Sequence, residues 1–336
     1  MSRDSTRRAA FVTSPFFPAT VLALILTATA ALFVGSYTTF LAAPVPHAIP
    51  LAIVAPAETG RPFDQALDAL LGGALQRIPM PDRAAAREAV LEQRVFGVLE
   101  YRGDDAARLQ LSGASGPSVA QLLSEQAPRA AAQTGIRIEV SDLTPLQRRD
   151  PRGLAIFYMT LAAVIIGFIG AMLYDVHARR LHPGERLAFL ALTAGSGGLA
   201  ITTVVDRVVG ALDLPFLSSW AILSLTMFAA EVACTMFGTL FGRWGMLPTW
   251  AIMVLLGNPS SGGTVSPALL PATLGTVGQW LPPGASISAH HTALYFPGHQ
   301  KAFPYLVLIG WGLVAGLVFW AFRHRHPGGR EKSSAR

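Results

Sequence analysis

The longest stretches without a charged side chain decide what this chain can fold into. Between Arg8 and Glu58 lie 49 residues with no Asp, Glu, Lys or Arg, and 57 such residues lie between Arg243 and Lys301. A helix that crosses a bilayer needs about 20 mostly apolar residues. Charged residues make up 14% of the chain, against about 25% in soluble domains. The sequence therefore predicts a polytopic α-helical membrane protein and excludes most soluble enzymes.

Six segments are expected to span the membrane: Phe17–Phe40, Gly153–Tyr174, Leu187–Ala211, Phe216–Phe241, Gly245–Gly257 and Phe303–Phe322. The fifth is the shortest, so we expect it to begin earlier or to be continued by a broken segment. The first follows Arg3, Arg7 and Arg8 and has the order of a signal peptide. Its apolar run is longer than the roughly 7–15 residues of a signal sequence, which favours an uncleaved anchor.

Basic residues in short loops set the orientation of a membrane protein. They gather before the first span, between the second and third spans, and in the tail after residue 322. We therefore expect residues 1–16 and the basic tail 323–336 in the cytoplasm, and residues 41–152 outside. The basic flanks face anionic lipid, which argues for membrane lipid and against nucleic acid as a partner. Lys301 and Lys332 are the only lysines among 26 basic residues, a bias typical of a GC-rich bacterial genome, so the predicted location is a bacterial plasma membrane.

Residues 41–152 are expected to form one small α/β domain inserted between the first two spans. Its predicted order is β-α-α-β-β-α-β, close to a split β-α-β arrangement. The first helix includes Phe63 and Ala74, the second starts at Pro81-Asp82, and the third opens on a capping box of Ser118 and Gln121. The predicted strands are Ala48–Ala55, Val95–Tyr101, Arg108–Ser112 and the alternating run around Ile138.

Motifs that carry chemistry are missing from the sequence. It has no G-x-S-x-G, no H-E-x-x-H and no Walker A pattern. Cys234 is the single cysteine, which excludes an intrachain disulfide. His290 and His291 are neighbours and do not share a helix face. We expect this chain to be no enzyme, with no catalytic residue, metal site or cofactor of its own.

Three ionisable residues fall within predicted spans, where charge is expensive and marks functional sites. Asp206 and Arg207 lie near the outer end of the third span. They form either a functional pair of sites or an interfacial cluster whose side chains reach outward to water. Glu231 lies about 15 residues into the fourth span, near mid-bilayer. A hydrogen bond to Ser196 or Thr193 and a role in transport are both open for it.

The stretch 258–302 is almost uncharged but rich in glycine and proline. Irregular backbone at membrane depth must be buried in protein or line a watery cavity. The sequence therefore predicts an external, re-entrant segment, with one short apolar helix over Pro267–Trp280. The residues that define this expected segment are Gly257, Asn258, Pro259, Gly262, Gly263, Pro282 and Pro283.

Three motifs carry a family resemblance: Arg-Val-Phe-Gly-Val-Leu-Glu at 94–100, Gly-Asn-Pro-Ser-Ser-Gly-Gly at 257–263 and Gln-Trp-Leu-Pro-Pro-Gly at 279–284. With the basic N-terminus and the six-span plan, the chain resembles the permease subunits of ABC-2-type transporters. Within them it is most similar to the YhgE/Pip (phage infection protein-like) branch. The resemblance covers nearly the whole chain.

The resemblance implies a dimeric export permease for a hydrophobic or amphiphilic substrate. Its energy would come from a separate cytoplasmic ATP-binding subunit, which would hold ATP and Mg²⁺. The loop Asp175–Arg186 would contact that subunit, through Arg179, Arg180, His182 and Glu185, although topology alone accounts for these charges equally well. The segment after the fifth span would form the external gate. The alternative is a non-transporting envelope protein, such as a secretion-apparatus scaffold or a surface receptor used by phage.

Overall fold

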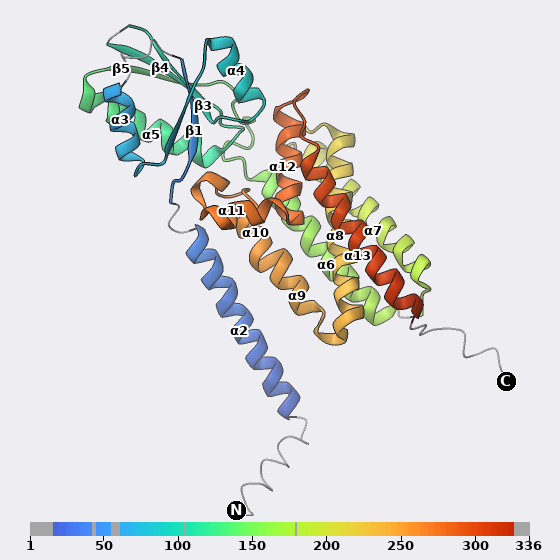
Figure 1. The fold of residues 1–336 in the computed structure, drawn as a ribbon. Coiled ribbons are helices and arrows are strands. Elements are labelled where there is room, and N and C mark those ends of the chain that lie inside the picture. The colour runs from blue at the N-terminus through green and yellow to red at the C-terminus, as the bar shows by residue number, and fades with distance from the viewer. Residues whose placement is uncertain (1–15, 42–44, 55–60, 104, 179, 326–336) are drawn as a thin grey trace, which may run out of the picture.

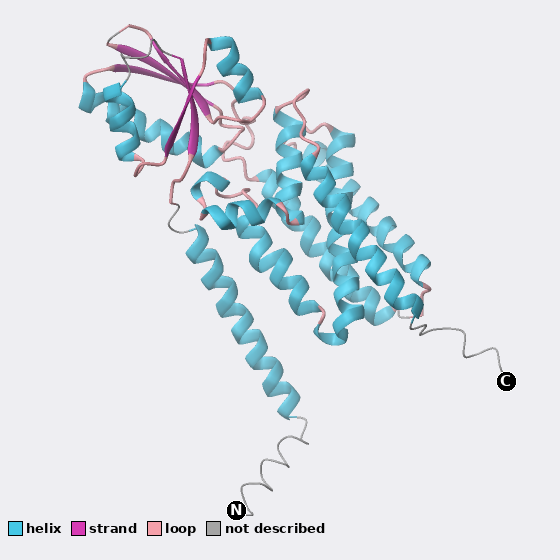
Figure 2. Cartoon of the chain, viewed as in Figure 1, coloured by secondary structure: helices cyan, strands magenta, loops and turns pink. Residues whose placement is uncertain are grey.

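The computed structural model describes residues 16–41, 45–54, 61–103, 105–178 and 180–325. A sheet-containing domain lies at one end of a bundle of long helices, and helix α2 runs beside the bundle (Figure 1). Strands occur in the sheet domain, while helix dominates the rest of the chain (Figure 2). The predicted N-terminal segment 1–16 falls almost wholly outside the described residues, and the basic tail is described only as far as Arg325.

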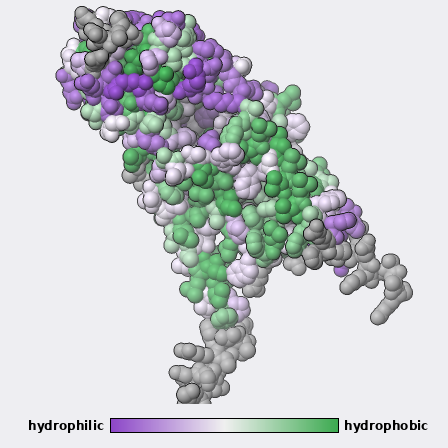
Figure 3. All heavy atoms as spheres, viewed as in Figure 1, coloured by the Kyte–Doolittle hydropathy of each residue, from purple (hydrophilic) through white to green (hydrophobic). Residues whose placement is uncertain are grey.

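Five helices are long and apolar enough to cross a membrane. Figure 3 shows their hydrophobic surface below a hydrophilic sheet domain. The chain is therefore a polytopic helical protein embedded in a membrane. The five helices are α2 (Phe16–Leu41), α6 (Ala155–His177), α7 (Pro183–Thr203) with its π-helical extension η1 (Val204–Val208), α8 (Phe216–Phe241) and α13 (Phe303–Arg325).

Helix α8 is the centre of the bundle, because α6, α7 and α13 all pack on it. Small residues allow the close approaches. A Cβ atom at Gly167 of α6 would lie 2.9 Å from the carbonyl oxygen of Met227, and one at Gly198 of α7 would lie 2.5 Å from Ser224 Oγ. Glycine at these positions lets the helix backbones meet without a side chain between them.

The predicted fifth span, Gly245–Gly257, is slightly longer in the structure, but it stays shorter than the five long helices. Helix α9 (Met246–Trp250), π-helix η3 (Ala251–Leu256) and helix α10 (Gly257–Ser260) follow one another directly, after a 3-10 turn, η2 (Gly242–Trp244). Fifteen helical residues span about 22 Å at 1.5 Å per residue, less than the ~30 Å hydrocarbon core. The helix continues through Asn258-Pro259, where the sequence indicated its end. A π-helical bond from Gly257 N–H to Ile252 O precedes the proline, and such widened turns accommodate local irregularity.

The sheet has five strands in the order β2-β1-β3-β4-β5. Strands β1, β2 and β3 are parallel, β4 is antiparallel to β3, and β5 is parallel to β4. The elements of this domain are β1 (Ile49–Val54), α3 (Arg61–Leu70), β2 (Leu75–Pro79), α4 (Arg83–Leu91), β3 (Gly97–Tyr101), β4 (Ala106–Leu111), α5 (Pro117–Thr134) and β5 (Arg137–Asp142).

The structure corrects two predictions for this domain. Strand β2 was not expected, and the element order is β-α-β-α-β-β-α-β. The predicted capping box is also wrong, because α5 starts at Gly116 without a side-chain cap and Ser118 bonds elsewhere. The start of the second helix is confirmed, since Asp82 Oδ1 accepts a 2.8 Å hydrogen bond from Ala85 N–H.

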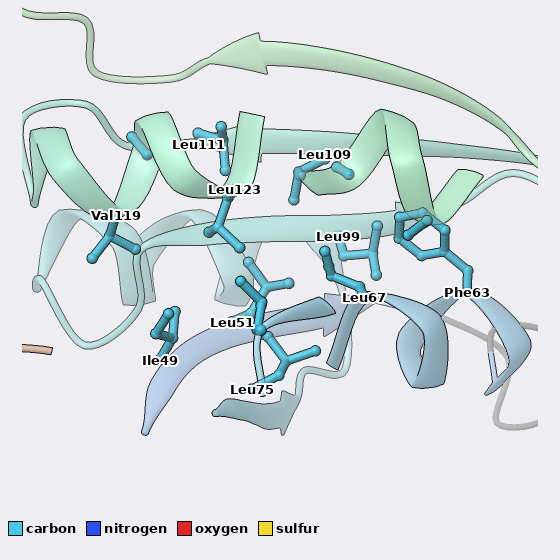
Figure 4. Packing of buried hydrophobic residues seen from close by; sticks show 14 of the residues in the cluster. Ile49, Leu51, Phe63, Leu67, Leu75, Leu99, Leu109, Leu111, Val119 and Leu123 are labelled. Carbon is cyan, nitrogen blue, oxygen red and sulfur yellow. The ribbon is translucent and has the colours of Figure 1, made fainter. Parts of the chain in front are cut away.

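The main core of the sheet domain lies under α3 and α5. Phe63, Leu67 and Leu123 point from these helices onto strand residues such as Leu51 and Leu99 (Figure 4). Helix α4 contributes to a second core with other residues of β1 and β3. A residue far away in sequence, Leu269, is buried in the first core with 3% exposure. The domain is therefore packed against the segment that follows α10.

Candidate functional site

Residues 257–302 form the junction segment, which connects the helical bundle to the sheet domain. It contains α10, the 3-10 turn η4 (Pro267–Leu269), α11 (Ala272–Gln279) and α12 (Pro282–Tyr295). The single helix predicted over Pro267–Trp280 is shorter in the structure, and α12 is an additional helix that the glycine and proline content concealed. Figure 1 shows α11 and α12 where the bundle meets the sheet domain.

Glycines bring the three helices of the junction segment into backbone contact. A Cβ atom at Gly278 of α11 would collide with the Ser260 carbonyl oxygen of α10, and one at Gly284 of α12 would collide with the Gly278 carbonyl oxygen. Gly257 lies against the ring of Pro283, which a Cβ atom would approach to 2.9 Å. The segment is thus a close-packed unit with no room for a methyl group at these positions.

The structure distributes the other predicted gate residues around this unit. Asn258, Pro259, Pro282 and Pro283 are buried. Gly262 has a φ of 83°, a left-handed conformation that favours glycine. A Cβ atom at Gly263 would lie 2.5 Å from Ile287 Cδ1 and 2.8 Å from Phe157 Cδ2, so this residue joins the segment to α6.

We expect Gly278→Ala to disorder the junction segment. The added methyl group meets backbone, which cannot move aside as a side chain can, and overpacking of this kind costs about 1–3 kcal/mol. The check is thermal unfolding of the purified protein together with limited proteolysis of the segment. Gly310→Ala in α13 is the matched control for available space, because a Cβ atom there meets nothing within 4 Å and the residue is helical, without a positive φ. Equal effects of both substitutions would contradict the packing argument.

Hydrogen bonds tie the junction segment to the bundle. Thr160 Oγ1 of α6 and Ser286 Oγ of α12 are 3.1 Å apart, and both residues are buried. Trp311 Nε1 of α13 donates to the carbonyl oxygen of Trp280 at 2.9 Å. Movement of α6 or α13 would therefore be transmitted directly to α11 and α12.

A second set of contacts ties the junction segment to the sheet domain. Ser118 Oγ of α5 donates to Ser266 Oγ at 3.0 Å and accepts from Ser266 N–H at 2.8 Å. His47 N–H donates to the Ala268 carbonyl oxygen at 2.9 Å. His291 Nδ1 lies 3.1 Å from the Ala114 carbonyl oxygen. The segment is therefore held from both sides, by the bundle and by the domain.

A further contact of this set joins two longer side chains. His299 Nε2 lies 2.8 Å from Glu88 Oε1 of helix α4. Burial lowers the pKa of the nearby Lys301 amine, and the charge of Glu92 opposes that shift. The contact between His299 and Glu88 places the C-terminal end of the junction segment against the sheet domain.

Asp206 and Arg207 lie in the π-helix η1 at the sheet-domain end of α7. Arg207 Nε is 2.7 Å from Asp206 Oδ2, and the Arg207 side chain is 72% exposed. Asp206 Oδ1 accepts a hydrogen bond from Leu214 N–H at 2.9 Å. The carboxylate thus fixes the turn between α7 and α8, while the guanidinium reaches outward.

Glu231 is completely buried in α8. Neither carboxyl oxygen has a hydrogen-bond partner among the described residues. The predicted partners Ser196 and Thr193 bond to backbone carbonyl groups of their own helix instead. Gly170 of α6 lies opposite, where a Cβ atom would be 3.4 Å from Glu231 Oε1. The hydrogen-bond interpretation with these two partners is therefore wrong.

At the other end of the bundle, a partly buried ion pair closes the short connection between α6 and α7. Arg186 Nη2 lies 2.6 Å from Asp175 Oδ1, and the Arg186 side chain is 9% exposed. Neither residue was among the predicted site residues, although they are the first and last residues of the predicted loop. Opposite charges at the ends of a short connection between apolar helices were the signal for this pair.

Three of the predicted coupling residues, Arg180, His182 and Glu185, lie in the connection between α6 and α7 or at the start of α7. Glu185 Oε2 accepts a 3.0 Å hydrogen bond from His182 N–H, which satisfies the first turn of α7. Arg180 is exposed. Arg179 lies outside the described residues. The connection therefore presents at least one exposed cation at the end of the bundle farthest from the sheet domain.

The buried carboxyl of Asp64 in the sheet domain has local partners. Burial raises the pKa of the Asp64 carboxyl, while the Tyr101 hydroxyl, which donates to it, and Arg77 oppose that shift. No group of three or more His, Cys, Asp or Glu residues in the described part of the chain could hold a metal ion.

Comparison with known proteins returned no relative. No family model matches the chain. No curated protein and no solved structure matches it either.

Proposed function

We propose that this chain is the membrane-spanning permease subunit of an ABC-type exporter. One observation carries the proposal. The junction segment folds back as two short helices after a half-length helix, and it is bonded to both the bundle and the sheet domain. A segment of this kind can open or close a path at one end of the bundle without breaking the long helices. The family resemblance of the motifs at 257–263 and 279–284 supports the same function.

The proposal assigns six crossings, and the fifth consists of α9, η3 and α10 continued by the rest of the junction segment. The sheet domain is then outside, and the connection at Arg180 is in the cytoplasm of a bacterial cell. ATP binding by a separate subunit would move this connection, and α6 would carry the movement to the junction segment. The substrate class, hydrophobic or amphiphilic, is the one that the family resemblance implies.

A second permease copy completes the proposed assembly. Helix α2 has no buried residue in the monomer. It touches the bundle near η3 and α10, where Tyr37 Oη lies 3.5 Å from the Val254 carbonyl oxygen. Lipid and a partner copy could each cover the remaining apolar faces of α2, and cross-linking at Leu26 distinguishes them.

The first test is purification of the tagged full chain in mild detergent, with co-purifying proteins identified and counted. We expect a stoichiometric ATPase with a Walker A loop. Its reproducible absence, with another envelope protein in its place, would contradict the proposal and favour a scaffold or receptor.

Charge reversal at Arg179 and Arg180 is expected to uncouple ATP hydrolysis from transport. A coupling free energy of 1–3 kcal/mol between two sites changes the affinity at one of them by about 5–150-fold, so removal of the coupling has an effect of that size. Transport should fall by about tenfold while the partner still hydrolyses ATP. Reversal at Arg330 and Lys332 in the tail makes the same charge change and should leave transport intact. Normal transport in the first variant, at normal expression, would exclude this connection as the coupling element.

A further inference from the structure

A cleft lies where the sheet domain meets the start of α6. Its volume is about 660 Å³, within the ~300–1,000 Å³ of small-molecule sites. One wall comes from the first turns of α5, including Ser118 and Gln121, and another comes from β5. Arg152 and Leu154 form the side next to the bundle. Because α6 begins at Ala155, the cleft opens at the level where the membrane surface meets this helix.

The cleft carries one cation and one anion. Arg152 is exposed and forms no ion pair with another described residue. The nearest carboxylate in sequence, Asp150, is buried and accepts hydrogen bonds from Leu154 N–H and Ala155 N–H. It is committed to the start of α6, so the guanidinium of Arg152 is available to a ligand. A guanidinium fork suits a phosphate group.

Asp142 supplies the anion. Its Oδ1 atom accepts hydrogen bonds from Gly113 N–H at 3.1 Å and Thr144 N–H at 3.0 Å. These bonds fix the carboxylate at the end of β5, and Asp142 forms no ion pair with a described residue. A carboxylate in the cleft opposes a purely anionic ligand and favours one that also has an ammonium group.

Beside Arg152, the bundle side of the cleft has an apolar surface that continues along α6. Leu146 and Leu154 line it. One helical turn beyond Leu154, Tyr158 is 59% exposed, and Ile166 and Ile169 are exposed farther along the helix. Residues three and four apart share a helix face, so an apolar track leads from the cleft down the surface of α6. A hydrocarbon chain on this track would reach into the bilayer.

We propose that this cleft binds the headgroup of a zwitterionic membrane lipid. The phosphate lies at Arg152, the primary ammonium lies at Asp142, and the acyl chains follow the apolar face of α6. Hydroxyl and amide groups of the cleft wall, such as Thr264 and Gln121, complete a polar site. The site does not depend on transport or on an ATPase.

The test is native mass spectrometry of the purified full chain, titrated with phosphatidylethanolamine, phosphatidylglycerol and phosphatidylcholine. We expect the tightest binding for phosphatidylethanolamine, which alone has both a phosphate and a primary ammonium. Arg152→Gln should weaken its binding about tenfold, since a charge-assisted hydrogen bond contributes on that scale. Arg152→Lys should retain most of the binding. Asp142→Asn keeps the acceptor for Gly113 and Thr144 but should abolish the preference over phosphatidylglycerol.

Arg148→Gln is the matched control, because this substitution removes the same charge. Arg148 is exposed and does not line the cleft. Equal weakening by Arg148→Gln and Arg152→Gln would overturn the proposal, since it would show general surface attraction. Equal affinity of the wild type for phosphatidylethanolamine and phosphatidylglycerol would also overturn it. So would competition by soluble phosphoethanolamine at the affinity of the lipid, which would assign the cleft to a free metabolite. Because no ATPase is present in this assay, its failure leaves the permease proposal standing, and the reverse also holds.

Discussion

Arg186→Leu is expected to destabilise the protein by about 2–3 kcal/mol, below the ~3–5 kcal/mol lost when one partner of a fully buried ion pair is removed. The Arg186 side chain is 9% exposed, and its Nη2 atom also lies 3.4 Å from the Ala171 carbonyl oxygen. Its removal leaves the Asp175 carboxylate beside apolar helix ends without this cation. The effect stays below the maximum because the Asp175 side chain is 43% exposed and water solvates part of it.

Thermal and denaturant unfolding in detergent measure the loss, with Arg180→Leu as the control on the same connection. Arg180 is exposed, and surface substitutions change stability by about 0.5 kcal/mol or less. The double substitution Asp175→Leu and Arg186→Leu should recover much of the stability, because replacing a whole buried pair by apolar residues is often neutral. If the double variant is as unstable as Arg186→Leu, the loss of Arg186 beside the Asp175 carboxylate is not the cause.

The long helices could be predicted because they depend on a property of single residues summed over a window. Twenty apolar residues in succession have few other ways to satisfy their backbone groups in a membrane. The fourth span was predicted with the bounds that the structure has, Phe216–Phe241. The start of the third was misplaced, since α7 begins at Pro183 and includes Arg186. An arginine that would end a span by composition is neutralised here by a partner from another helix.

Strand β2 and helix α12 could not be predicted for a different reason. Strand β2 is an edge strand that pairs only with β1, and its five residues, Leu-Gln-Arg-Ile-Pro, lack a clear alternation of apolar and polar side chains. Helix α12 begins with Pro282-Pro283-Gly284, which reads as a turn. Proline is tolerated in the first helical turn because its missing N–H has no partner there. Tertiary packing decided both elements.

In the candidate site, too, local composition could be interpreted from the sequence, whereas contacts between distant residues could not. Glycine and proline content located the junction segment, and the structure brings Gly257 and Pro283 of the predicted gate into contact. Its bonds to the sheet domain join residues that are far apart, such as Ser118 and Ser266, which are separated by 148 positions. No local pattern encodes such a bond. From the sequence, Ser118 was interpreted as a helix cap, because a serine at the start of a helix commonly bonds to a backbone N–H of the first turn.

Glu231→Met is expected to raise the stability of the protein by about 1–3 kcal/mol, the cost of a buried polar group without a hydrogen bond. Both carboxyl oxygens of Glu231 lack a described partner at the centre of the bundle. A methionine fills a similar volume and needs no partner. A carboxyl group that makes the folded state less stable is expected to have another role. We therefore expect Glu231→Met to reduce transport about tenfold, which corresponds to ~1.4 kcal/mol in the limiting barrier.

Glu231→Gln separates the two effects, because it keeps the shape of the side chain and removes its ability to ionise. We expect Glu231→Gln to impair transport more than folding, measured as substrate efflux from vesicles and as thermal unfolding of the same preparation. Thr235→Val is the control, since Thr235 Oγ1 is another buried atom of α8 without a described partner. It should gain stability and keep transport. Parallel losses of stability and transport in Glu231→Gln would instead assign the carboxyl a structural role in holding α8 against α6. Movement of the junction segment would then depend on packing contacts and not on the ionisation of Glu231.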